Sequence, residues 1–117
     1  MRNKREIGFE YEKIAGEYLK THGYDIVEYN FYSRHGEIDI IAKHEGYLVF
    51  VEVKYRENDT SGHPLEAVSL AKQKAICKCA MYYMTKKHLQ DVSVRFDVVG
   101  ICGNEVTLVQ NAFDFII

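Results

Sequence analysis

Two stretches of the sequence decide the fold, HGEIDII at His35–Ile41 and LVFVEVK at Leu48–Lys54. Both are rich in β-branched and aliphatic residues, as is typical of strands in a buried sheet. Between them they also carry three acids and one lysine. A carboxylate in such a core loses its hydration and needs a cation or strong hydrogen bonds instead. We therefore interpret the two stretches as a candidate site for a divalent metal ion with a lysine beside it.

The two predicted strands form a hairpin whose register sets the distance between the acids. The segment KHEG at Lys43–Gly46 predicts a four-residue loop, in which Gly46 can adopt a positive φ. Asp39 then lies opposite Phe50 and is a diagonal neighbour of Glu52, about 7–8 Å away between backbones. Two carboxylates at that spacing can share one cation, whereas a slip of one residue would place them on opposite faces.

A solvated cross-strand ion pair among Glu37, Glu52 and Lys54 is the alternative interpretation of the same residues. Side chains alternate along a strand, so Glu52 and Lys54 share one face, and Glu37 shares a face with Asp39 as a supporting acid. We favour the buried site, because both faces of the second strand carry apolar side chains. These are Val49, Val51 and Val53 on one face and Leu48 and Phe50 on the other.

The spacing of Asp39, Glu52 and Lys54, Asp-x12-Glu-x-Lys, resembles the PD-(D/E)xK superfamily of nucleases, which includes restriction enzymes, repair nucleases and junction resolvases. Longer strings resemble YraN, a small and largely uncharacterised bacterial family described as endonuclease-like. These strings are Asn30, Gly36–Ala42, Val49–Lys54, Arg56 and Arg95–Val99. The resemblance extends from about Gly8 to Phe113, which is nearly the whole chain.

The alternation of helical and strand patterns predicts a three-layer α/β domain in the order αβββαββ, with a crossover through the second helix. The resemblance implies the same architecture, a restriction-endonuclease-like fold with helices flanking a mixed central β-sheet. The predicted elements are a helix at Arg5–Thr21, a strand at Tyr24–Tyr32, the hairpin, a loop at Glu57–His63, a helix from Pro64, and strands at Val92–Cys102 and Glu105–Gln110. At 117 residues, we expect residues 1–117 to form one domain.

The charge balance does not resemble the strongly basic surface expected of a nucleic-acid-binding protein, because the formal net charge is −2. The basic residues do cluster, however, near the start of the chain, beside the candidate site and on the second helix. Our candidates for nucleic-acid contacts are Arg56, Lys72, Lys74 and Arg95. Lys72 lies within the apolar stripe of its helix, where it either extends out of the core or points into the cleft at a phosphate, and we favour the cleft.

Glu12 lies on a flank of the first helix where small residues allow another element to approach closely. The YraN resemblance includes Glu12 and Ala15, although Tyr11 takes the place of the family's usual glycine. Two interpretations of Glu12 are open at this point. It forms a solvated salt bridge, which is usual for a glutamate on a helix, or it is a third carboxylate that reaches the metal ion.

These residues predict metal-dependent hydrolysis of a phosphodiester bond in DNA, with branched or damaged DNA as a candidate substrate. Carboxylate oxygens suit Mg²⁺ or Mn²⁺, so we expect Asp39 and Glu52 to hold the ion together with the backbone carbonyl of Val53. Lys54 would orient the attacking water or stabilise developing negative charge. The alternatives are a non-catalytic nucleic-acid-binding or adaptor module on the same fold, and a structural subunit that docks a partner enzyme.

The remaining sequence bears on location and assembly. No segment approaches the roughly 20 apolar residues that span a bilayer, and the charged start does not resemble a signal peptide. Three cysteines are too few, and odd in number, for a disulfide scaffold, so we expect a cytoplasmic protein. We predict a weak homodimer that would pair two active sites, with the apolar C-terminal segment at Ala112–Ile117 or a sheet edge as its contact. The alternative is that this segment covers the chain's own core.

Overall fold

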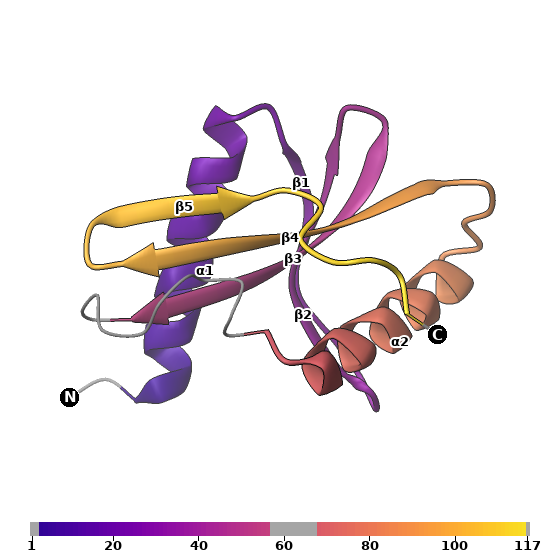
Figure 1. Ribbon diagram of the computed structural model, residues 1–117, viewed down its shortest axis with the longest axis horizontal. Coiled ribbons are helices and arrows are strands. Elements are labelled where there is room, and N and C mark those ends of the chain that lie inside the picture. Colours follow the sequence, from indigo (N-terminus) through magenta and orange to yellow (C-terminus); the bar gives the residue numbers. More distant parts are fainter. Residues whose placement is uncertain (1–2, 57–67, 117) are drawn as a thin grey trace.

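The computed structural model describes residues 3–56 and 68–116 and has the predicted α/β architecture (Figure 1). Its elements are α1 (Lys4–Thr21), β1 (Asp25–Ser33), β2 (Gly36–His44), β3 (Tyr47–Arg56), α2 (Leu70–Lys86), β4 (Ser93–Cys102) and β5 (Glu105–Val109). This order confirms the αβββαββ fold predicted from the sequence. The predicted loop at Glu57–His63 lies outside the described residues.

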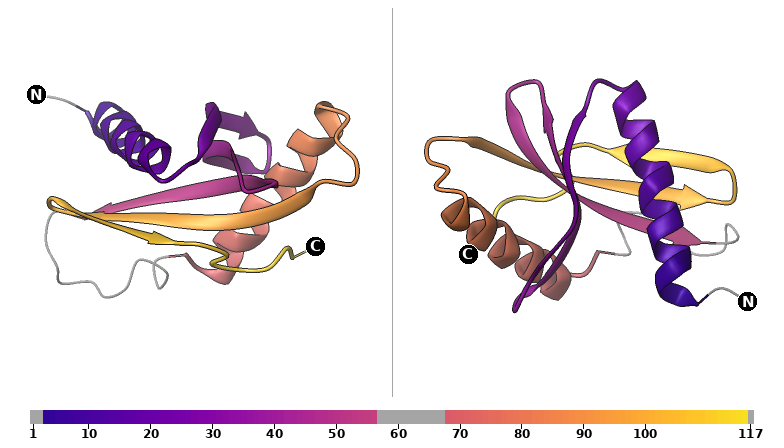
Figure 2. Two further views of the ribbon diagram at one scale, coloured as in Figure 1. Left: turned by 90° about the horizontal axis from the view of Figure 1, so that it is seen from above. Right: turned by 180° about the vertical axis from the view of Figure 1, so that it is seen from behind.

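The strands form one mixed sheet in the order β1-β2-β3-β4-β5, with β3 and β4 parallel and the other neighbours antiparallel. The parallel pair requires a crossover, and α2 is part of it. The helices lie on opposite faces of the sheet, α1 over a core that includes Leu19 and α2 over a core that includes Tyr83 (Figure 2). Within the described residues, neither helix is long and apolar enough to cross a bilayer.

The second helix begins later than the sequence pattern suggested. The prediction placed its start at Pro64, which lies outside the described residues, whereas α2 begins at Leu70. Ser69 is the N-cap, and its hydroxyl accepts a hydrogen bond from the backbone N–H of Lys72 at 3.2 Å. This cap satisfies one of the free N–H groups at the start of a helix and places Lys72 in the first turn.

The hairpin between β2 and β3 is tighter than predicted. Its turn contains only Glu45 and Gly46, both at positive φ (50° and 85°), as in the type I′ turns that fit the twist of a hairpin. Ile41 therefore pairs with Phe50, where the predicted register had Asp39. The register is shifted by two residues, an even number, so the paired residues Ile40–His44 keep their predicted faces. The backbone pairing ends at Ile40 and Val51, just before the two acids.

β1 and β2 change sides in the middle of their pairing. Tyr29 and its partner Ile40 pack in the core under α1, whereas Phe31 and its partner Ile38 belong to the core under α2. Residues two apart on a regular strand would face the same way. Asn30 lies between the tyrosine and the phenylalanine with φ 55°, a left-handed conformation that is uncommon for a residue with a side chain. The change of sides thus coincides with a kink in β1 at Asn30.

The C-terminal segment after β5 covers the chain's own core. Phe113 stacks on Phe96 with ring centroids 5.0 Å apart. The backbone N–H of Ile116 donates to the Cys77 sulfur at 3.3 Å, which fastens the segment to α2. Of the two interpretations of this apolar end, the structure shows packing on the core of the same chain.

Gly16 and Gly8 of α1 should respond in opposite ways to an added methyl group. A Cβ on Gly16 would overlap the Tyr29 ring, whereas a Cβ on Gly8 would meet nothing within 4 Å. Gly16→Ala is therefore expected to lower the free energy of unfolding by about 1–3 kcal/mol through overpacking. Gly8→Ala should raise it by about 0.5–1 kcal/mol, because alanine favours the helix. Urea unfolding of both variants measures this, and equal effects would contradict the close contact of α1 with the sheet.

Candidate functional site

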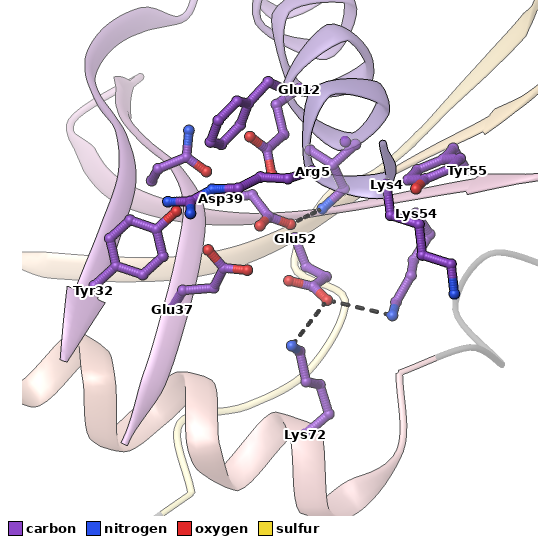
Figure 3. Close-up of a pocket in the computed structure, with 14 residues that line it drawn as sticks. Lys4, Arg5, Glu12, Tyr32, Glu37, Asp39, Glu52, Lys54, Tyr55 and Lys72 are labelled. Atoms are coloured by element: carbon purple, nitrogen blue, oxygen red, sulfur yellow. Dashed lines mark hydrogen bonds and ion pairs between the residues drawn. The ribbon is translucent and has the colours of Figure 1, made fainter. Parts of the chain in front are cut away.

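A cleft of about 550 Å³ opens between the first half of α1, the start of β2, the end of β3 and the start of α2 (Figure 3). Four acids and four cations line it, namely Glu12, Glu37, Asp39 and Glu52, with Lys4, Arg5, Lys54 and Lys72. The fold therefore brings together all the side chains that the sequence predicted for catalysis and metal binding. Two of the predicted nucleic-acid contacts, Arg56 and Lys74, are exposed and are not among the residues that line the cleft.

Asp39 lies at the bottom of this cleft with only 7% of its surface exposed. Its Oδ2 atom accepts a hydrogen bond from the backbone N–H of Val53 at 2.8 Å. Because the backbone pairing of β2 with β3 has already ended, the carboxylate takes the place of a backbone carbonyl as the acceptor. This contact ties Asp39 to β3 through the N–H of Val53. The role predicted for the Val53 carbonyl, as a metal ligand, remains a prediction.

Glu52 is also buried, with 4% of its surface exposed, and it pairs with lysines from two elements. Its Oε2 atom lies 3.5 Å from Nζ of Lys54 on β3 and 3.6 Å from Nζ of Lys72 on α2. Both lysines are partly exposed, so they connect the buried acid with the mouth of the cleft. Lys72 thus points into the cleft, as its position in the apolar stripe suggested. Its contact with a phosphate remains a prediction.

Glu12 and Asn30 each present a buried oxygen without a hydrogen-bond donor among the described residues, Oε1 of Glu12 and Oδ1 of Asn30. Burying an oxygen in this way costs free energy unless a donor or a cation satisfies it. Glu12 lies beside the other acids, and Asp39 and Asn30 are the side chains that hydrogen-bond with it. The two unsatisfied oxygens are what a bound cation, or a donor group of a ligand, would complete.

Burial is the main reason why the pKa of Asp39 rises from 3.8 to about 9, and the nearby charges of Glu52 and Glu12 add to the rise. The hydrogen bond from Val53 opposes it in part. Asp39 therefore holds a proton at neutral pH when no cation is present. Burial also raises the pKa of Glu12, while its side-chain hydrogen bonds with Asp39 and Asn30 lower it in part.

The acids by themselves do not form a complete metal cage. Among residues 3–56 and 68–116, no three His, Cys, Asp or Glu side chains come together as a group that could hold an ion. A divalent ion would therefore use neutral oxygens as well, and the unsatisfied amide oxygen of Asn30 is one that the structure provides. An all-oxygen set of this kind suits a hard cation such as Mg²⁺ or Mn²⁺.

Arg95, which the sequence suggested as a nucleic-acid contact, lies away from the cleft in a buried network. Its guanidinium donates to both carboxylate oxygens of Asp97 at 2.9 Å and to the Tyr24 hydroxyl at 3.0 Å. It also lies 2.9 Å from Nδ1 of His44, while Asp97 is fully buried. This placement argues against a nucleic-acid contact, because the donors of Arg95 serve a structural ion pair. Arg95 and Asp97 are two residues apart and share a face of β4, which explains their bidentate pairing.

Several residues of the cleft had no assigned role in the sequence interpretation. Asn30 was noted only within the family resemblance, because a kink in a strand leaves no periodic signal. Tyr32 and Tyr55 follow ordinary strand patterns, and only their neighbours in the fold place them beside the acids. Lys4 and Arg5 belong to the basic cluster near the start of the chain, which was the available signal for them.

The sequence profile described as Uncharacterised protein family UPF0102 matches residues 11–101, a range that contains Glu12, Asp39, Glu52, Lys54 and Lys72. A UPF0102 protein of Lachnoclostridium phytofermentans is 46% identical over 113 residues, covering 96% of each chain. A UPF0102 protein of Persephonella marina is 43% identical over 107 residues, covering 92% of each chain. One from Thermodesulfovibrio yellowstonii is 46% identical over 110 residues, covering 92% of this chain and 96% of the relative. These names state a family and no activity.

Asp39→Asn should stabilise the metal-free protein more strongly as the pH rises. Between pH 3.8 and about 9 the folded state keeps the proton of Asp39 while the unfolded chain has lost it, so rising pH lowers stability across this window. The asparagine side chain does not titrate, so the variant does not lose stability in this way as the pH rises. Urea unfolding in EDTA at about pH 5 and about pH 8 measures the difference. The exposed Asp25→Asn on β1 is the control, and an equal gain from Asp39→Asn at both pH values would contradict the prediction.

Replacing Arg95 should affect folding, because the change leaves the fully buried Asp97 without its cation. Arg95→Met is expected to lower the free energy of unfolding by about 3–5 kcal/mol. Arg34→Met, at an exposed position between β1 and β2, should change it by less than about 0.5 kcal/mol. Thermal unfolding of the two variants makes the comparison. Parent-like stability of Arg95→Met would mean that the network is not structural.

Proposed function

The chain belongs to the uncharacterised protein family UPF0102, the YraN-type family, and from this premise we propose that it is a metal-dependent endonuclease that hydrolyses phosphodiester bonds in DNA. The observation that carries the proposal is the single cleft in which Asp39, Glu52 and Lys54 meet. Two carboxylates less than a tenth exposed, with lysines beside them, are costly to bury and do not serve the hydrophobic core. Branched or damaged DNA is the candidate substrate.

The donor set of the cleft supports a site for Mg²⁺ or Mn²⁺. Asp39 and Glu52 would hold the ion with the Val53 carbonyl, and the unsatisfied oxygens of Glu12 and Asn30 would complete its ligands. All five groups offer oxygen, which these hard cations prefer. A bound divalent cation would also offset the burial and the neighbouring negative charges that keep Asp39 protonated in its absence.

The bound metal ion would lower the pKa of a water molecule and neutralise charge on the phosphoryl oxygens. The chain's own groups would do the positioning. Lys54, 3.5 Å from Glu52, would orient the attacking water or stabilise developing negative charge. Lys72 reaches the same acid from the start of α2 and would bind a phosphate oxygen of the substrate.

A non-catalytic nucleic-acid-binding or adaptor module is the second candidate, favoured by the incomplete grouping of the acids among the described residues. The predicted homodimer belongs to the proposal as well, because cutting both strands of DNA requires two sites. Since Phe113 and Ile116 pack on the core, a sheet edge, β1 or β5, is the contact we propose for it.

Calorimetry with Mn²⁺ and cleavage of DNA should separate the roles of the acids and the lysine. Asp39→Asn and Glu52→Gln should lose Mn²⁺ binding, whereas Lys54→Met should bind Mn²⁺ but cut DNA at least about 100-fold more slowly. Lys43→Met, an exposed lysine on the same hairpin and outside the cleft, is the matched control. Because Asp39 holds a proton before the ion binds, binding should release about one proton, which calorimetry in buffers of different ionisation enthalpy detects.

The substrates for this test are linear, nicked, flapped and four-way-junction DNA. Unchanged Mn²⁺ affinity in both acid variants would overturn the metal site. Cutting by Lys54→Met at the parent rate would reduce Lys54 to an ion-pair partner of Glu52. Mn²⁺ binding without cutting of any substrate would favour the non-catalytic module.

A further inference from the structure

Three exposed aromatic side chains share the rim of the cleft. They are Phe9 from α1, Tyr32 from β1 and Tyr55 from β3, with 41%, 52% and 38% of their surface exposed. Single exposed aromatic residues are common on any protein surface. Three of them, from three different elements, surround one charged cleft and point to a ligand with flat, apolar faces.

Tyr55 is held in place from one side. Its ring stacks on the Tyr11 ring with centroids 4.2 Å apart and an angle of 9° between the planes. Because Tyr11 belongs to α1 and Tyr55 to β3, the stacking holds the Tyr55 ring against the helix, and this ring still keeps more than a third of its surface exposed. A ring that is already ordered loses little conformational entropy when a second flat group stacks on it. Tyr55 therefore has the properties of a stacking platform.

Positive charges lie among the rings. Lys4, Arg5, Lys54 and Lys72 line the same cleft. The Arg5 guanidinium lies 5.5 Å from the centre of the Phe9 ring, and in the view of Figure 3 Tyr32 and Tyr55 lie on opposite sides of the acids. Aromatic faces alternating with cations match the alternation of bases and phosphates along a single nucleic-acid strand.

We propose that the cleft binds an unpaired nucleotide, with its base stacked on Tyr55 and a second base on the strand held by Tyr32. The substrate class is then DNA with a single-stranded segment, such as a fork, flap or gap. In a continuous duplex both faces of each base are already stacked, so the rings would have no partner. A cleft of about 550 Å³ has the size that encloses one small ligand, and not a double helix. The cutting of such DNA rests on the proposed function, whereas the binding does not.

Fluorescence anisotropy with a labelled thymidine oligonucleotide of about 12 nucleotides tests the binding, with Ca²⁺ and again with EDTA. The parent should bind this strand more tightly than a duplex of the same length. Tyr55→Ala and Tyr32→Ala should each weaken single-strand binding about 5- to 150-fold, and Tyr55→Phe should retain it. Tyr82→Ala is the matched control, since Tyr82 is 46% exposed on α2 and does not line the cleft.

An oligonucleotide of the same length with abasic sites separates stacking from charge. It keeps every phosphate, so the parent should lose the same factor as a double variant, Tyr32→Ala with Tyr55→Ala, loses on the normal strand. The double variant should lose no more when the bases are removed. Thermal unfolding checks that Tyr55→Ala still folds, and Tyr55→Leu, which keeps an apolar body against Tyr11, repeats the test if it does not.

Equal affinity for single strand and duplex, or parent-like binding by both alanine variants, would overturn this inference. The experiments distinguish a failure of this inference from a failure of the proposed function. Ring-dependent binding of single strands without any cutting in Mn²⁺ would refute the nuclease and leave the stacking site standing. Cutting of continuous duplex as fast as of forked DNA, unaffected by Tyr55→Ala, would leave the nuclease and refute the stacking site.

Discussion

Two carboxylates buried next to each other, Asp39 and Glu52, are the constraint around which this small domain is arranged. Their mutual repulsion and lost hydration oppose folding, and the surrounding elements offset this free-energy cost in different ways. The pairing of β2 with β3 ends at Ile40 and Val51, and beyond it Asp39 accepts a hydrogen bond from the N–H of Val53. The start of α2 brings Lys72 to Glu52, beside Lys54 of the same strand. The two carboxylates thus lie where the pairing of β2 with β3 ends and where α2 begins.

Two polar clusters of this chain differ in whether their buried groups have hydrogen-bond partners, and this difference separates a structural cluster from a candidate functional one. Around Arg95 and Asp97, charges and hydroxyl groups are mutually satisfied, and the cluster is nearly closed to solvent. In the cleft, oxygens of Glu12 and Asn30 are buried without donors among the described residues. A fully satisfied network holds a core together, whereas an unsatisfied one stores a cost that a ligand can relieve.

The sequence was sufficient for the features that depend on periodicity. Alternation along β2 and β3 predicted that the acids share a cleft, and the order of helices and strands followed from the patterns. It failed where geometry depends on backbone detail. The two-residue turn at Glu45 and Gly46 and the kink at Asn30 rest on positive φ angles at residues other than glycine, which composition does not reveal. The burial of Arg95 could not be foreseen, because a strand pattern does not show which arginine meets a buried acid.

The parallel pairing of β3 with β4 has a consequence for folding. Tyr47 pairs with Ser93, 46 residues later, whereas the hairpin of β2 and β3 closes through a two-residue turn. Local contacts form before distant ones, so β3 spends part of the folding process with one edge unpaired. An apolar strand in that state readily joins other chains. Glu52 and Lys54 interrupt the apolar run of β3 with opposite charges. The residues proposed for chemistry therefore also lower the tendency of the unpaired strand to aggregate during folding.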